Sequence, residues 1–126
     1  MKTTVEERLA VAKTIWAQIR ATLTTSELWS WGISKRYYDE YNGMPALRLR
    51  VSGLLHKGWA VICYNYGYDW YEVYFINMRG EVKDKIDEVY CDDLGRVLDR
   101  RIERGDFTEA EYAKKAMADS NRKLNR

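Results

Sequence analysis

The side chains that most often carry catalysis are few in this chain, and none has a partner at a useful spacing. His56 is the only histidine, and we expect it at the surface or in a loop, without a second metal ligand. Cys63 has apolar neighbours, which indicates a buried thiol rather than a nucleophile that His56 would activate. The acid pairs Asp39-Glu40 and Asp92-Asp93 are expected to be solvated, because strand neighbours point to opposite faces and acids favour an early helical turn.

Recognised motifs for phosphate, metal or acyl chemistry are also missing from the sequence. It contains no glycine-rich phosphate loop, no G-x-S-x-G and no Cys/His ladder. We therefore predict no catalytic, cofactor-binding or metal-binding residue and no cofactor, and the sequence favours a role other than catalysis. A small enzyme without a recognisable motif is the last alternative.

The unusual feature is the position of the aromatic residues, since 13 of the 17 lie between Trp29 and Phe75. One helix-covered face of a sheet cannot easily hold them all, so some should lie on a second, open face. Alternation along the strands, with Trp31 and Leu49 pointing towards the helices, places arginines among tyrosines on that open face. The candidate binding residues are Arg36, Tyr38, Arg48, Arg50, Lys57 and Tyr74.

These side chains need a sheet to position them, and the hydrophobic periodicity predicts one after a first helix. Apolar residues recur at helical spacing from Val5 to Leu23, behind a Thr4-x-x-Glu7 capping box. Period-two alternation then predicts four antiparallel strands, with Asn42-Gly43 as the strongest turn signal. The predicted strands run from Trp29 to Tyr38 or Tyr41, from Leu47 to Val51, from Trp59 to Tyr64 and from Trp70 to about Met78.

Two helices are predicted after the sheet. The first begins between Asp84 and Asp87 and ends at Gly105, and the second opens with the capping box Thr108-x-x-Glu111. The predicted fold class is therefore α+β, with an N-terminal helix, a four-stranded antiparallel meander and two C-terminal helices. Residues 1–105 are predicted to form a single domain. Residues 106–126 would add a helix with a basic tail, either as part of that domain or as a helical-hairpin appendage.

Composition narrows the setting of the protein. Hydrophobic residues make up 46% of the 126 residues, with one proline, which favours a folded globule. The net charge of +2 is too small to imply nucleic acid by itself. The longest apolar run, Trp59 to Tyr64, is too short to span a bilayer, and the acidic N-terminal stretch lacks the apolar core of an export signal. Cys63 and Cys91 are expected as two buried thiols, so a cytoplasmic location is predicted.

Several short segments carry a resemblance to known proteins: Trp29-Ser-Trp-Gly-Ile-Ser34, Leu47–Val51, Tyr71-Glu-Val-Tyr-Phe75 and Val89-Tyr-Cys-Asp-Asp-Leu94. Together they resemble a loose family of small bacterial proteins associated with phages and mobile elements. That resemblance implies no activity and no catalytic residue. Separately, residues 102–115 are similar to the short C-terminal helical-hairpin module at the ends of many bacterial proteins, which implies assembly or interaction.

The leading hypothesis is a non-enzymatic interaction protein, with a protein partner or a second copy (a homodimer) meeting the aromatic sheet face or the C-terminal hairpin. The alternative is a single-stranded nucleic-acid-binding module, in which bases stack on tyrosines while arginines hold phosphates. Glu72, which would share the face, argues against phosphate binding. A third interpretation leaves an ordinary solvated surface, with the arginine stems lying over the rings. No membrane partner is expected.

Overall fold

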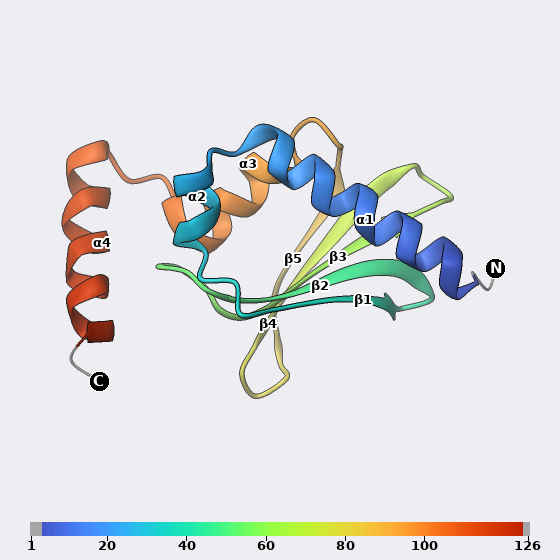
Figure 1. The fold of residues 1–126 in the computed structure, drawn as a ribbon, viewed down its shortest axis with the longest axis horizontal. Coiled ribbons are helices and arrows are strands. Elements are labelled where there is room, and N and C mark those ends of the chain that lie inside the picture. The colour runs from blue at the N-terminus through green and yellow to red at the C-terminus, as the bar shows by residue number, and fades with distance from the viewer. Residues whose placement is uncertain (1–3, 125–126) are drawn as a thin grey trace.

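A single sheet of five antiparallel strands carries the fold, and helices pack on one of its faces (Figure 1). The computed structural model describes residues 4–124. Its elements are α1 (Val5–Thr22), α2 (Thr25–Ser30), β1 (Lys35–Tyr41), β2 (Met44–Ser52), β3 (Lys57–Asn65), β4 (Trp70–Asn77), β5 (Val82–Val89), α3 (Leu94–Asp99), the π-helix η1 (Arg100–Arg104) and α4 (Glu109–Leu124). The strands lie side by side in sequence order. The predicted α+β class and antiparallel meander are confirmed, with one strand more than predicted.

Helix α1 begins where the sequence predicts, because Thr4 caps it. The Thr4 hydroxyl oxygen accepts a hydrogen bond from the Glu7 amide at 3.1 Å, and this satisfies an amide that has no partner in the first helical turn. The helix then buries Ala12, Ile15 and Ile19. Their spacing of three and four residues is that of an amphipathic helix packed on a core.

The segment after α1 is a helix, α2, where alternation predicted a strand starting at Trp29. A capping box explains the difference: the Glu27 amide donates to the Thr24 hydroxyl at 3.1 Å, and the Thr24 amide donates to the Glu27 carboxylate at 2.9 Å. These reciprocal bonds fix a first helical turn. Trp29 is 84% exposed whereas Trp31 is fully buried, so the two do not share a strand face. The first strand begins only at Lys35.

Strand β5 replaces the start of the helix that was predicted between Asp84 and Asp87. It is an edge strand, and edge strands commonly carry charged side chains that discourage further pairing. Only Ile86 and Val89 of β5 contribute to the core, so the strand shows little hydrophobic alternation. The predicted helix starts later, as α3, and continues as η1. It ends at Gly105, whose φ of +59° suits a glycine stop, as predicted.

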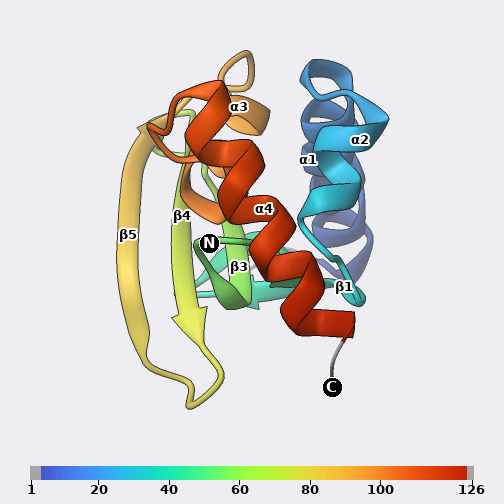
Figure 2. The same ribbon diagram turned by 90° about the vertical axis from the view of Figure 1, so that its left-hand side faces the viewer.

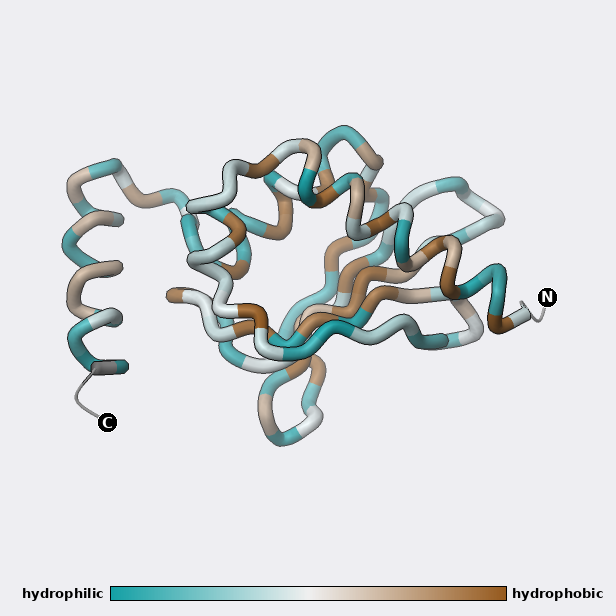
Figure 3. Tube along the Cα trace, in the orientation of Figure 1, coloured by the Kyte–Doolittle hydropathy of each residue, from teal (hydrophilic) through white to brown (hydrophobic). Residues whose placement is uncertain are grey.

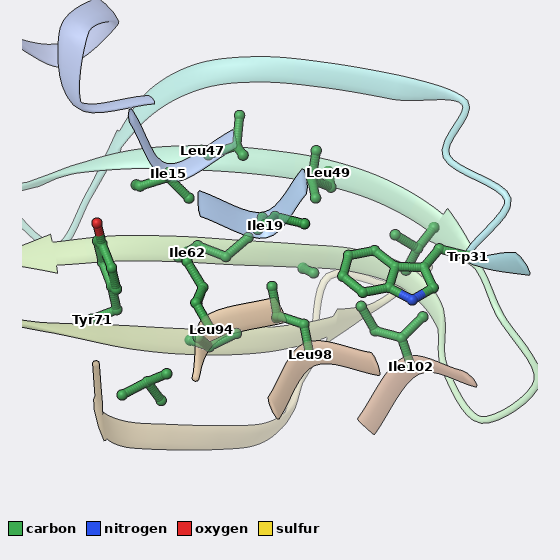
Figure 4. Packing of buried hydrophobic residues seen from close by; sticks show 14 of the residues in the cluster. Ile15, Ile19, Trp31, Leu47, Leu49, Ile62, Tyr71, Leu94, Leu98 and Ile102 are labelled. Atoms are coloured by element: carbon green, nitrogen blue, oxygen red, sulfur yellow. The ribbon is translucent and has the colours of Figure 1, made fainter. Parts of the chain in front are cut away.

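The core lies between the sheet and the helices α1, α3 and η1 (Figures 2 and 4). Residues with no exposed surface line both sides of it: Ile15, Ile19, Trp31, Leu49, Ala60, Ile62, Val73, Phe75, Leu94, Leu98 and Ile102. Hydrophobic residues are concentrated along the central strands, whereas α4 is mostly polar or weakly hydrophobic (Figure 3). Within the described part of the chain, every helix is too short or too polar to cross a membrane.

Helix α4 stands beyond one end of the sheet rather than on its face (Figure 1). The predicted capping box is present, since the Glu111 amide donates to the Thr108 hydroxyl at 3.2 Å. Polar contacts join the helix to the body: Tyr112 hydroxyl to Glu103 carboxylate (2.7 Å), Lys57 ammonium to Asp119 carboxylate (3.5 Å) and Lys123 ammonium to Ser52 carbonyl (2.9 Å).

Candidate functional site

The face of the sheet opposite the helices is open. Among residues 4–124, α1, α2 and α3 lie on the other side of the sheet and α4 stands beyond its end (Figures 1 and 2). Strand register assigns side chains to this open face, because directly opposed residues point to the same side. Three central rows of side chains cross it: row I is Lys35, Arg50, Trp59, Ile76 and Val82; row II is Tyr37, Arg48, Val61, Tyr74 and Lys85; row III is Asp39, Ala46, Cys63 and Glu72. Beyond row III the same face carries Tyr41, Met44, Asn65 and Trp70.

Trp59 is the centre of an aromatic and cationic cluster on the open face. The guanidinium carbon of Arg48 lies 4.5 Å from the centroid of the indole, and that of Arg50 lies 5.7 Å away. The Tyr37 ring lies at 6.1 Å from the same indole. A cation over an aromatic face is attracted by the electrons of the ring, so these contacts hold the two arginines across the strands.

Tyr74 of β4 is a second aromatic centre, with β2 and β3 between its strand and the edge strand β1. The Tyr41 ring lies 4.7 Å from it, and the Lys85 ammonium lies 5.3 Å from its centroid. Its hydroxyl oxygen accepts a hydrogen bond from the Asn42 side-chain amide at 3.2 Å. Tyr74 is only 7% exposed, so it packs as part of the surface layer rather than projecting from it.

The small side chains of the open face are buried although no helix covers them. Ala46, Val61 and Cys63 have no exposed surface, because the neighbouring rings and stems lie over them. Burial raises the pKa of the Cys63 thiol to about 12, so the expected inert, buried thiol is confirmed at this position. The expectation for Cys91 is wrong: it is exposed, since it lies in the turn after β5 rather than inside a helix.

Charges on the open face are sorted along the strand direction. Row I is basic through Lys35 and Arg50, while row III is acidic through Asp39 and Glu72. Hydrogen bonds lower the pKa of Glu72, chiefly the one from the Asn65 amide at 2.7 Å, against the opposing effect of burial. The Glu72 carboxylate therefore stays ionised at neutral pH.

The structure brings together only part of the predicted binding set. Arg48, Arg50 and Tyr74 lie on the open face, as alternation predicted. The predicted placement of Arg36 and Tyr38 there is wrong: they pair with Leu49 and Leu47 and share the helix-covered side. Arg36 lies over the Trp16 ring of α1, 4.5 Å from its centroid. The expected alternation of side chains started at Trp31, but Trp31 belongs to no strand. The predicted sides of Arg36 and Tyr38 were therefore the reverse of the observed ones.

Lys57 lies at the hairpin end of β3, where its ammonium donates to the Gly53 carbonyl at 2.7 Å and faces α4. His56, expected at the surface or in a loop, lies in a loop and is only 6% exposed. The residues that were missed are Tyr37 and Trp59. The Asn42-Gly43 turn would have revealed Tyr37, because a two-residue hairpin pairs Tyr41 with Met44 and fixes every register position before it.

The geometry defines an α+β protein with one helix-covered and one open sheet face. A scan against protein-family models, a search of curated proteins and a search of solved structures all found no match for the chain. Two resemblances therefore stay predictions: that of the short segments to a bacterial family and that of the C-terminal segment to an assembly module.

Proposed function

We propose that this protein is a non-enzymatic interaction protein that associates with a second copy of itself through the open face. The observation that carries the proposal is the Trp59 cluster: rings and arginines that favour protein interfaces lie together on a sheet face without a covering helix in residues 4–124. Removing exposed aromatic surface of this kind from water makes association with a partner more favourable.

The order of the charged rows supports a second copy as the partner. In a twofold dimer whose axis runs along row II, the basic row I of one copy faces the acidic row III of the other. Lys35 of one chain then lies opposite Asp39 of its partner, since both belong to β1. The Lys35–Asp39 pairing is self-complementary, as an isologous interface requires. Arg48 and Lys85 of row II would each meet their own copy on the axis, where carboxylates of the same chain already offset their charge. The edges are unsuited to pairing, because β1 and β5 are rich in charged residues.

Sedimentation velocity at several protein concentrations tests the proposal. Tyr37 and Tyr38 offer a matched pair, since they are 47% and 50% exposed and point to opposite faces. We expect Tyr37→Glu to convert the dimer into a monomer, because a buried, unpaired carboxylate opposes association. Tyr38→Glu should leave the dimer intact. A wild-type chain that stays monomeric at every concentration contradicts the proposal.

A charge exchange tests the orientation of the two copies. Lys35→Glu should weaken the dimer, because it places two acids against each other, and adding Asp39→Lys should restore it. If the double variant is weaker than either single variant, the twofold axis does not run along row II.

A single-stranded nucleic acid is the second candidate partner. The observation that favours it is Arg50, which lies beside the Trp59 ring and forms no ion pair with any residue of the described range. Fluorescence anisotropy with a labelled oligonucleotide at low salt should show binding that weakens steeply with added salt. Arg48→Ala/Arg50→Ala should abolish it, whereas Arg36→Ala, on the other face, should not. Equal affinity of the double variant and the wild type removes this candidate.

A further inference from the structure

A cavity of about 420 Å³ lies on the helix side of the sheet, between α1 and the ends of β3, β4 and β5. This volume is within the range that small organic ligands occupy. Its lining includes Gln18 of α1, Tyr64, Asp69, Tyr71, Tyr90 and Cys91. The cavity lies mainly on the core side of the sheet, because Tyr64 and Tyr71 face each other there across β3 and β4. Trp70 also lines it and links it to the open face, since its indole nitrogen donates to the Glu72 carboxylate at 3.3 Å. Figure 4 shows Tyr71 at one end of the core cluster.

The tyrosines of the cavity wall are held in place by hydrogen bonds. The Tyr71 hydroxyl donates to the Gln18 side-chain oxygen at 2.5 Å, and the Tyr64 hydroxyl donates to the Asp69 carboxylate at 2.5 Å. The Asp69 hydrogen bond raises the pKa of Tyr64 to about 12, so this phenol keeps its proton at neutral pH. The rings of Tyr64 and Tyr71 lie 5.7 Å apart. The aromatic part of the wall is therefore uncharged and pre-formed.

The charges at this site have one sign. Among the residues that line the cavity none is lysine or arginine, and the one charged side chain is Asp69. Two further carboxylates contact the lining from the rim: Glu88 accepts from the Tyr90 hydroxyl at 3.3 Å, and Asp92 accepts from the Cys91 thiol at 3.7 Å. An anion brought here would meet no positively charged lining side chain, and the Asp69 carboxylate would repel it.

We propose that this cavity binds a small organic cation with an apolar body, such as an alkylated or aryl-substituted ammonium ion. Aromatic rings attract the positive charge through their electron-rich faces. Asp69 supplies the counter-charge at the wet end, while Ala10 and Val11 of α1 and Val89 contact the apolar body. An ammonium ion shielded by alkyl groups suits this wall better than a strongly hydrated one, because it loses less water on entry.

Three probes of similar size and different charge test the proposal by NMR titration of the full chain. Benzyltrimethylammonium carries the positive charge, benzyl alcohol is neutral and phenylacetate is negative. We expect the cation to shift the amide signals of the cavity residues at millimolar concentrations. The affinity for the alcohol should be lower by a factor of about ten or more, and phenylacetate should not bind. Equal affinity for cation and alcohol, tighter binding of the anion, or no shift with the cation overturns the proposal.

Asp69→Asn isolates the role of charge. Asp69 has a φ of +54°, which asparagine also tolerates, and the amide oxygen still accepts the Tyr64 hydroxyl proton, so the turn should keep its shape. The variant should lose most of the preference for the cation over the alcohol. Unchanged preference overturns the assignment of Asp69.

Two exposed tyrosines separate the aromatic wall from a general surface effect. Tyr90 lines the cavity at 49% exposure, whereas Tyr38, at 50% exposure, is on β1 and outside it. Tyr90→Ala should weaken binding of the cation about fivefold, and Tyr38→Ala should leave it unchanged. Equal effects of the two substitutions contradict the proposal. Both readouts are independent of self-association, because neither residue belongs to the three rows of the open face.

Discussion

Asp99 shows how a single buried polar residue shapes the stability of this fold. Its carboxylate accepts a hydrogen bond from the indole nitrogen of Trp31 at 2.8 Å and is only 5% exposed. Burial raises its pKa, and the Trp31 hydrogen bond opposes that shift only in part. The charge of Asp99 therefore costs stability at neutral pH, since a raised pKa means that the folded state holds the proton more tightly than the unfolded chain.

Asp99→Asn should stabilise the protein at neutral pH. The amide oxygen still accepts from Trp31, but the buried charge is gone. The gain should shrink as the pH falls through the folded pKa of Asp99 towards its ordinary value of 3.8, because the wild-type carboxyl is then neutral as well. Urea unfolding of both proteins at several pH values measures this. A variant that is less stable at every pH would show that Asp99 stabilises the fold as an anion.

The stability of the protein should depend on pH near neutrality through the imidazole of His56, because it is the only histidine. Burial, more than the nearby Arg101, lowers its pKa below the ordinary 6.5. The unfolded chain thus takes up a proton more readily, and stability should fall as the pH drops through 6.5 towards the folded pKa. In His56→Gln, urea unfolding between neutral and mildly acidic pH should show a smaller loss. An identical pH slope in wild type and variant contradicts this assignment.

At the scale of elements, Gly95 sets the approach of α3 to α1. A methyl group at this position would collide with the Thr22 hydroxyl and lie 3.1 Å from the Ile19 carbonyl oxygen. Helix propensity alone predicts that alanine would stabilise α3 by about 1 kcal/mol. We expect the opposite sign.

Gly95→Ala should lower the free energy of unfolding by about 1–3 kcal/mol, because the two helices would be forced apart. Chemical denaturation measures it. Adding Thr22→Ala should recover part of the loss by removing the hydroxyl, and Gly67→Ala, which meets only the Asn65 side chain at 3.3 Å, serves as the control. A stabilised Gly95→Ala protein would mean that α3 shifts freely.

Helix α4 should open more readily than the rest of the protein. Tyr112→Phe removes the hydroxyl that donates to Glu103, while the Leu54 amide still donates to that carboxylate at 2.6 Å. We expect faster hydrogen exchange along α4 and unchanged exchange in β2, β3 and β4, because local opening follows the contacts that are lost. Faster exchange throughout the sheet would instead make α4 an integral part of the domain.

The elements that could be predicted from the sequence are those with local signals. The caps at Thr4 and Thr108, the Asn42-Gly43 turn and the stop at Gly105 each act within a few residues. The signal that was missed at α2 was also local, since Thr24 and Glu27 form the same capping box. The start of β5 had no such signal, because an edge strand gains its ladder from its neighbour rather than from its own hydrophobicity.

For the whole molecule, the open face was predictable in outline and the cavity was not. Alternation in β2 was enough to separate Arg48 and Arg50 from the core, since successive side chains of one strand point to opposite faces whatever the strand packs against. The placement of Arg36 failed because it required the start of another strand. The cavity joins Gln18 to Asp69 and Tyr90, three positions that only the finished packing of α1 on the sheet brings together.

The arrangement of the chain ends has a mechanical consequence. Helix α1 begins at one end of the longest axis of the molecule, and α4 ends at the other (Figure 1). Tension applied between the two ends would load the few polar contacts of α4 before it reached the strand ladders. Stretching with optical tweezers should therefore give a small, reversible extension at low force, as α4 detaches, followed by one larger rupture of the sheet and its helices. A single rupture at high force would show that α4 is bound as firmly as the core.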